Sequence, residues 1–259
     1  MTSAPSSRHF VVRAVPLLQP LRWLALGWGD LLRCPVPGLV HGLVSALFGA
    51  ALVLLARDRF WFLAGAFSGF LLVAPLVATG LYAVSRELER GSRPTLATAL
   101  AAWRPRDSRL VRFGLLLAVA GTGWVLTSAA LITRFARAPV LSPSDFLQVV
   151  VVSDPSRLFE IWLLLGSVLA APMFASSVVA IPMLLDRPVT VLSAVGASVN
   201  ASLLSPAALA LWATLILVIS MLGMATVMLG LVVAVPWLAH SSWHAYRDLI
   251  QPAETAGDS

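Results

Sequence analysis

The sequence predicts an all-α membrane protein: a bundle of six spans in three hairpin-like repeats, with amphipathic helices at its cytoplasmic surface. Three observations lead to this fold class. The chain of 259 residues is 59% hydrophobic and only 12% charged, whereas soluble domains are about a quarter charged. It contains several apolar runs of the length that a bilayer span needs, about 20 residues. All 18 basic residues are arginine, and they lie almost entirely between these runs.

The apolar runs define the spans in order. They are Val36–Ala56, Phe60–Val84, Leu110–Ile132, Leu158–Leu185 and Pro206–Tyr246. As one helix, the last run would be about 60 Å long, twice the thickness of the hydrocarbon layer. We therefore expect it to form two helices with a turn near 222–224, which makes six spans. Residues 20–250 are expected to form one membrane domain, after a flexible segment 1–19 and before a disordered tail 251–259.

Three further segments have apolar residues at helical spacing, a pattern typical of helices that lie in the membrane interface. The apolar faces consist of Leu21, Leu24, Trp28, Leu31 and Leu32; of Leu96, Leu100 and Trp103; and of Leu192, Val195, Val199 and Leu203. In the first segment, Arg22, Asp30 and Arg33 are expected on the opposite face. Each segment precedes an outward span followed by an inward one, which predicts the threefold repeat.

A Gly–Pro spacing recurs in the three expected inward spans and supports this repeat. The pairs are Gly69 and Pro75, Gly166 and Pro172, and Gly230 and Pro236. An arginine follows the first and third prolines by 11 residues, at Arg86 and Arg247. A proline within a helix frees a backbone carbonyl and kinks the helix. That carbonyl could bind a solute or ion in a transporter, but a kink that serves packing is the favoured interpretation.

The distribution of arginine predicts the orientation of the chain. With the amino terminus in the cytoplasm, thirteen of the 18 arginines lie on the inner side, so the positive-inside rule places both termini in the cytoplasm. Juxtamembrane arginines of this kind contact lipid phosphates. No compact basic face with interleaved aromatic residues is present, so nucleic acid is not an expected partner. Asp186 and Arg187, which follow Pro182, are expected to end a helix at the membrane surface.

The candidate metal ligands lie near the carboxy terminus. His240, His244 and Asp248 are spaced at i, i+4 and i+8, and His41 is expected at a similar depth. Imidazoles at this spacing can bind zinc, a similar metal or a haem iron. The favoured interpretation is instead that they form hydrogen bonds across the bundle or to lipid headgroups. The neighbouring residues are typical of an interfacial anchor: Trp243, Tyr246 and Arg247.

Catalytic and cofactor-binding motifs are not found. The chain contains no HExxH, GxSxG or P-loop sequence, and we expect no enzymatic activity and assign no cofactor. No charged side chain lies at an expected bilayer midplane, where coupled transporters usually place one. This lowers the expectation of ion-coupled transport.

Three stretches carry a family resemblance. Ser68–Gly91, Phe174–Arg187 and Leu229–Arg247 resemble signature segments of a bacterial family of integral membrane proteins, domain of unknown function 2189. The similarity extends over about residues 20–250, and Ala239 departs from it where the family tends to have glycine. The resemblance implies a multi-pass protein of the bacterial inner membrane with no established activity, and it supplies no catalytic residues.

Taken together, these patterns favour a non-enzymatic scaffold, accessory or assembly protein that acts on a membrane-protein partner through helix–helix contacts in the lipid bilayer. Two alternatives stay open. One is a transporter or channel for a small solute, built on the proline-kinked helices. The other is a carrier of metal or haem that uses His240 and His244. The sequence does not indicate an oligomeric state.

Overall fold

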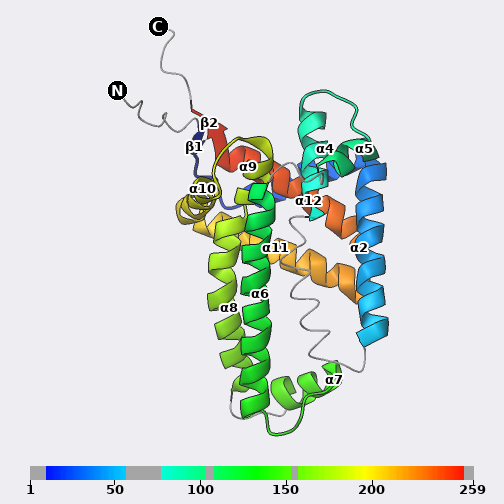
Figure 1. The fold of residues 1–259 in the computed structure, drawn as a ribbon, viewed down its shortest axis with the longest axis vertical. Coiled ribbons are helices and arrows are strands. Elements are labelled where there is room, and N and C mark those ends of the chain that lie inside the picture. Colours follow the sequence, from blue (N-terminus) through cyan, green and yellow to red (C-terminus); the bar gives the residue numbers. More distant parts are fainter. Residues whose placement is uncertain (1–9, 57–76, 103–107, 153–156, 254–259) are drawn as a thin grey trace.

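The structure is a computed structural model that describes residues 10–56, 77–102, 108–152 and 157–253 (Figure 1). Its helices are α1 (Gln19–Arg33), α2 (Pro35–Ala56), α4 (Thr79–Glu89), α5 (Leu96–Ala101), α6 (Ser108–Phe135), α7 (Pro143–Asp145), α8 (Leu158–Ser177), α9 (Ala180–Asp186), α10 (Val191–Leu204), α11 (Pro206–Ala225) and α12 (Leu231–Leu249). A π-helical segment, Phe146–Val152, follows α7. Two short strands, β1 (Phe10–Val12) and β2 (Ile250–Pro252), complete the described elements.

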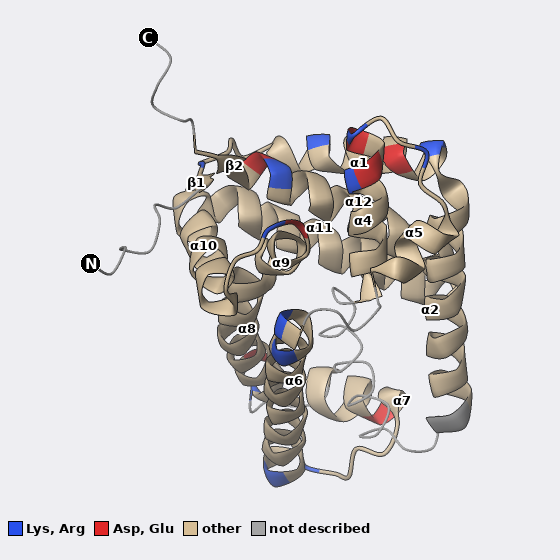
Figure 2. Cartoon of the chain, turned by 45° about the horizontal axis from the view of Figure 1, so that its top comes forward, with Lys and Arg blue, Asp and Glu red and all other residues tan. Residues whose placement is uncertain are grey.

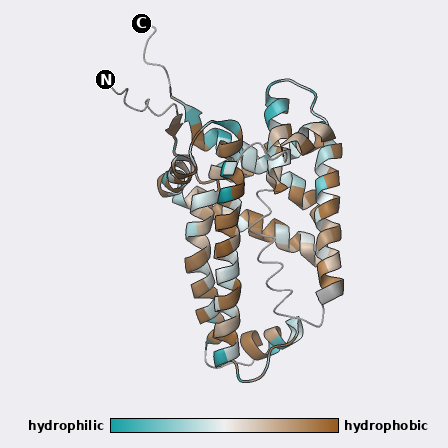
Figure 3. Cartoon of the chain, viewed as in Figure 1, coloured by the Kyte–Doolittle hydropathy of each residue, from teal (hydrophilic) through white to brown (hydrophobic). Residues whose placement is uncertain are grey.

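Four described helical segments are long and apolar enough to cross a membrane. They are Pro35–Leu54, Ser108–Phe135, Leu158–Asp186 and Pro206–Ala225. These segments match the first, third, fourth and fifth predicted spans, so the prediction of a helical membrane protein is confirmed at this level. Figure 3 shows apolar residues along the whole length of α2, α6 and α8. Most of the second predicted span, along with Gly69 and Pro75, lies outside the described residues.

The sixth predicted span corresponds to α12, which is not among these four segments. Only its first part, Leu231–Ala239, is continuously apolar. At 1.5 Å per residue this part is about 14 Å long, roughly half the hydrocarbon thickness. From His240 onward the helix is rich in polar side chains. Six spans and three repeats therefore stay a prediction.

The turn between the last two helices lies a few residues after its predicted position. Residues 222–224 still belong to α11, and the chain reverses at Thr226–Gly230, where Val227 and Met228 have φ values of 54° and 67°. Gly223 is needed for packing instead, because a Cβ atom there would lie 2.9 Å from the Leu231 side chain. The Thr226 hydroxyl donates to the carbonyl of Gly223 (2.9 Å) and accepts from the amide of Gly230 (2.8 Å).

The core lies at one end of the molecule, around α12. In Figure 1, α2, α6 and α8 run along the long axis, and α11 and α12 run across it. α12 packs mainly against α1 and α2 and also contacts α4, α11 and α9. The largest fully buried side chains of this core are Trp23, Trp212, Trp243 and Tyr246. Charged residues gather at this same end, where α1, α4 and α12 meet (Figure 2).

Helices form in all three segments that were predicted to be amphipathic, but their faces are used differently. In α1, Trp23, Leu24, Gly27, Asp30 and Leu31 are buried. Asp30 was expected to face water, and this was wrong. The carboxylate is buried because two side chains from other helices bond to it, as described below. Leu21, Trp28 and Leu32 remain exposed, so α1 has a packed apolar face and an outer apolar face.

α10 shows the same division. The predicted apolar residues Leu192 and Leu203 are exposed, and the face that packs consists of the small residues Ala194, Ala197, Ser198 and Ala201. Small side chains let this helix approach α8 and α9 closely. The exposed leucines are left for contact with lipid. α5 ends at Ala101, and Trp103 lies outside the described residues.

The two ends of the described chain are paired. β1 and β2 form an antiparallel ladder in which Val11 is opposite Gln251, and the amide of Arg13 donates to the carbonyl of Leu249 (2.9 Å). β1 lies within the segment 1–19, and β2 extends across the predicted boundary between the membrane domain and the tail 251–259. Backbone hydrogen bonds between segments far apart in sequence carry no local signal, which is why the sequence did not indicate this pairing.

Candidate functional site

The polar half of α12 forms the candidate site, because its side chains reach three other helices. Each of five side chains bonds to a neighbour: His240 to Ser85 of α4, Trp243 and Arg247 to Glu89 of α4, His244 to Asp30 of α1, and Tyr246 to Asp186 of α9. Five predicted site residues are thus joined to partners that lie from 60 to 214 positions away in the chain.

Four of these residues make up the buried polar cluster: Asp30, Ser85, His240 and His244. The Ser85 hydroxyl lies 2.8 Å from Oδ2 of Asp30 and 2.7 Å from Nδ1 of His240. Nε2 of His244 lies 2.8 Å from the same carboxylate oxygen. Asp30 is 4% exposed, Ser85 1% and His240 0%. A buried carboxylate needs charged or hydrogen-bonding partners, and these contacts supply them.

Electrostatics in the cluster favours an ionised Asp30 and a neutral His240. Burial alone would raise the pKa of Asp30, but hydrogen bonds from His244 and Ser85, followed by electrostatic attraction to His244, lower it. Burial also lowers the pKa of His240 to about 4, although the charge of Asp30 opposes this shift. With an ionised Asp30, the Ser85 hydroxyl donates to the carboxylate. Nδ1–H of His240 then donates to the Ser85 oxygen.

This order of donors differs from that of a nucleophilic triad. In a Ser–His–Asp triad the histidine accepts the serine proton, and the aspartate orients the histidine. Here the serine lies between the other two groups, and its proton points to the carboxylate. Ser85 is also buried, with 1% of its surface exposed. The geometry therefore links α1, α4 and α12 and does not activate the hydroxyl.

The four predicted metal ligands are not gathered into one site. Asp248 accepts hydrogen bonds from the side chains of Gln19 (2.5 Å) and Trp23 (2.8 Å) of α1. Nδ1–H of His41 donates to the carbonyl of Pro37 (2.7 Å). Within the described ranges, no three His, Cys, Asp or Glu side chains converge as a metal site. Nε2 of His240 is buried and has no hydrogen-bond partner among the described residues.

A second group of bonds fixes α12 to α9. The Tyr246 hydroxyl donates to Oδ2 of Asp186 (2.7 Å) and accepts from Nε of Arg187 (2.9 Å). Burial, followed by the bond to the Asp186 carboxylate, raises the pKa of Tyr246. Arg86 donates to the carbonyl of Leu185 (3.3 Å). The prediction that Asp186 and Arg187 end a helix holds, and their side chains also bind the carboxy-terminal helix.

Three glycines allow α12 to approach α1 and α2 at backbone distance. A Cβ atom at Gly27 of α1 would lie 2.5 Å from the amide nitrogen of Ser241. A Cβ atom at Gly38 of α2 would lie 3.0 Å from Cβ of Pro236, and one at Gly42 would lie 2.1 Å from the carbonyl oxygen of Val232. Side chains larger than hydrogen do not fit at these positions, so the glycines set the separation of the helices.

The contact at Gly42 bears on the predicted role of Pro236. Pro236 lies within α12 and cannot donate to the carbonyl four residues earlier, which belongs to Val232. That carbonyl lies against Gly42, where a weak Cα–H···O contact can form. The space beside it is filled by α2, which supports the interpretation of the Pro236 kink as a packing feature.

The other predicted Gly–Pro positions also lie in packed or helical settings. A Cβ atom at Gly166 of α8 would lie 3.0 Å from the ring of Trp124 in α6. Pro172 lies within α8, and Pro182 is buried in α9. At Gly230, a Cβ atom would lie 2.8 Å from Cα of Gly223. These glycines serve the contacts of the α6–α8 and α11–α12 pairs.

Sequence reasoning missed two parts of this site. Asp30 was expected on the polar face of its helix, and neither Ser85 nor the glycines of α2 were identified as contact residues. A signal for the glycines existed, since Gly38, Gly42 and Ala46 follow the small-xxx-small spacing of closely packed membrane helices. For Asp30 the signal was weaker: it is the single acidic residue of α1.

Comparison with known proteins bears out the family resemblance. Residues 62–186 match the family described as "Predicted integral membrane protein (DUF2189)". The first two signature segments fall in this range except for Arg187, and the third, with α12, lies outside it. The match is thus narrower than the similarity over about residues 20–250 that the sequence suggested. Neither the comparison with curated proteins nor that with solved structures finds a match.

Proposed function

We propose that this integral membrane protein is a non-enzymatic scaffold or assembly factor that binds a membrane-protein partner through its spanning helices. One observation carries the proposal. The polar side chains that could have served chemistry or transport bond mainly to other helices of the same chain, and the Val232 carbonyl lies against Gly42. These features support a structural role for the polar half of α12, which holds helices of the same chain together.

The surfaces left for a partner are the outer faces of the spans. Leu43 is 49% exposed, Leu47 61% and Leu54 72% along α2. Several large apolar side chains of α6 and α8 are exposed as well, among them Leu116, Val119 and Leu164. A bilayer accommodates such faces, and small residues and leucines on them also suit lateral helix packing. One end of the molecule is held together by hydrogen bonds around α12, and the long helices expose apolar faces. This arrangement suits a protein that binds a partner through helix–helix contacts.

The proposal includes the orientation. The β1–β2 pair holds the two described chain ends side by side, which supports both termini on one side of the membrane. The arginine distribution favours the cytoplasm. We place the protein in the bacterial inner membrane, with α1, α5, α10 and the polar half of α12 at the cytoplasmic surface. The repeat of three hairpins and six crossings remains part of this proposal.

Site-specific photocrosslinking in the native membrane tests the proposal. A photoreactive residue at Leu47 of α2 is expected to give a discrete protein adduct, because this side chain points outward. The matched control is the same residue at Leu209 of α11, which is 2% exposed and should give none. The adduct is identified by mass spectrometry, and the same protein must be recovered when Leu54 carries the probe.

Three results would count against a scaffold. The first is a Leu47 probe that yields lipid adducts alone. The second is solute flux in liposomes of purified protein that is lost in Pro236→Ala, which would favour the transporter. Stoichiometric metal or haem that is lost when His240 and His244 are both changed to alanine would favour the carrier.

A further inference from the structure

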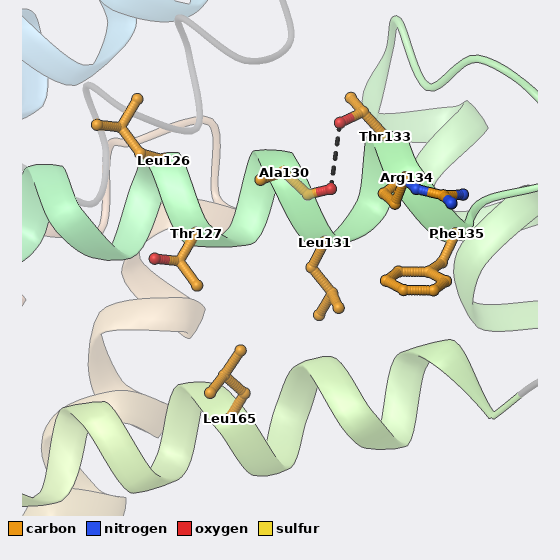
Figure 4. Close-up of a pocket in the computed structure, with 8 residues that line it drawn as sticks. All are labelled: Leu126, Thr127, Ala130, Leu131, Thr133, Arg134, Phe135 and Leu165. Carbon is orange, nitrogen blue, oxygen red and sulfur yellow. Dashed lines mark hydrogen bonds between the residues drawn. The ribbon is translucent and has the colours of Figure 1, made fainter.

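A groove between α6 and α8 is a second candidate site, far from the buried polar cluster. Its volume is about 760 Å³, and it is lined by Leu126, Thr127, Ala130, Leu131, Thr133, Arg134, Phe135 and Leu165. Figure 4 shows these residues along the last turns of α6, with Leu165 facing them from α8. The groove lies at the end of α6 opposite to Arg109 and Arg112, and Figure 2 shows arginine at both ends of this helix.

The groove offers one charged group and an apolar wall. The hydroxyl groups of Thr127 and Thr133 donate to the carbonyls of Gly123 (2.8 Å) and Ala129 (2.7 Å) in their own helix. They are therefore engaged within α6. The guanidinium of Arg134 lies over the ring of Phe135, 5.6 Å from its centre. No carboxylate among the described residues forms an ion pair with it.

The dimensions suit a lipid molecule. Leu126 and Arg134 are eight positions apart, which is about 12 Å along a helix. An acyl chain parallel to the membrane normal can follow this length between α6 and α8. An arginine at the end of a spanning helix extends its charged group toward the interface, where lipid phosphates lie. Guanidinium and phosphate form strong bidentate hydrogen bonds.

We propose that the α6–α8 groove binds one anionic phospholipid, with its phosphate on Arg134 and an acyl chain along Leu126, Leu131 and Leu165. An anionic lipid fits better than a zwitterionic one, because its phosphate has no internal ammonium group that competes with Arg134. A protein partner would have to bring both a carboxylate and an apolar surface to the same place. A phospholipid supplies an anionic phosphate and an apolar acyl chain in one molecule. This inference requires membrane insertion but is independent of the scaffold proposal.

Native mass spectrometry of the full chain tests this site. Protein in mild detergent is titrated with phosphatidylglycerol and, separately, with phosphatidylethanolamine. We expect one tightly retained phosphatidylglycerol and weaker retention of phosphatidylethanolamine. Arg134→Gln should weaken phosphatidylglycerol binding about tenfold or more, since a hydrogen bond to a charged group is worth about 1.5–3 kcal/mol.

The matched control is Arg112→Gln. Arg112 is an exposed arginine of the same helix at its other end, and its loss should leave retention unchanged. A second variant, Ala130→Phe, keeps the charge and fills the groove with a ring at an exposed position, so it should also abolish retention. Equal melting temperatures in detergent verify folding of each variant.

The inference is overturned if Arg134→Gln retains phosphatidylglycerol as wild type does, or if the two arginine variants lose it equally. It is also overturned if inorganic phosphate occupies Arg134 with the same affinity as the lipid, or if a second copy of the chain covers the groove in place of a lipid.

Discussion

Gly42 gives the sharpest test of how the candidate site is built. Replacing it with alanine adds one methyl group to α2 at the point where α12 is closest. That methyl carbon would lie 2.1 Å from the carbonyl oxygen of Val232, 2.6 Å from its carbonyl carbon and 2.7 Å from its Cα. All three are backbone atoms of a helix, so no rotamer change can relieve the contact. The two helices must separate.

The cost can be set against the intrinsic preference of the helix. Alanine in a helix is favoured over glycine by about 1 kcal/mol, and overpacking a well-packed contact costs about 1–3 kcal/mol. Because the contact is with backbone, we expect the upper part of that range. Gly42→Ala should therefore lower the free energy of unfolding by about 1–2 kcal/mol net. Separation of α2 and α12 should also loosen the buried polar cluster next to them.

Gly123→Ala is the matched control, since a Cβ atom at Gly123 of α6 would meet nothing within 4 Å. This variant should be neutral or more stable than wild type, so the two glycine changes are expected to have opposite signs. Unfolding by a denaturing detergent, followed by circular dichroism and tryptophan fluorescence, measures both. If Gly42→Ala is as stable as Gly123→Ala, the close approach of α2 and α12 is refuted, and with it the packing role of Pro236.

Three further predictions concern the polar contacts. Asp30→Ala leaves Ser85 and His244 without their shared acceptor and should lower the free energy of unfolding by about 3 kcal/mol. Its control is Leu32→Ala, at an exposed position of the same helix, which should lower it far less in the same unfolding assay. The free energy of unfolding should fall as the pH drops from about 6.5 toward 4. The reason is that a histidine in the unfolded chain takes up a proton near pH 6.5, whereas His240 in the folded protein does so at about 4. At still lower pH, the lowered pKa of Asp30 acts in the same direction. Melting temperatures at a series of pH values should show this slope in wild type and a smaller one in His240→Gln, and an equal slope in both would exclude His240 as its source. Tyr246→Phe removes the hydroxyl that joins Asp186 and Arg187 and should cost about 1 kcal/mol; an unchanged melting temperature would mean that the link to α9 contributes nothing.

Periodicity and hydropathy predicted the parts of the structure that depend on local sequence. α2, α6 and α11 correspond closely to apolar runs, and α1 and α10 form in two of the segments with amphipathic spacing. The prediction worked because helix formation and membrane insertion both follow from residues near one another in the chain. The turn at Thr226–Gly230 was placed slightly early because glycine signals both a turn and a close contact, and Gly223 has the second role.

The arrangement of side chains around α12 could not be predicted in this way. His240, His244 and Asp248 share one helical face, yet they bond to three different partners: Ser85, Asp30, and the Gln19–Trp23 pair. Which partner each one finds depends on how α1 and α4 cross α12. That crossing is set by close contacts such as Gly27 against Ser241, which have no periodic signal.

The sequence by itself determined that this chain is helical, that it lies in a membrane and where several of its long apolar helices lie. These properties depend on the solvent and on neighbours within a few residues. Only the tertiary structure decided that Asp30 is buried, that the chain ends are paired and that the Val232 carbonyl lies against α2. Each of these depends on contacts between segments far apart in sequence. A buried polar group needs a hydrogen-bond partner, and for Asp30 other helices supply it.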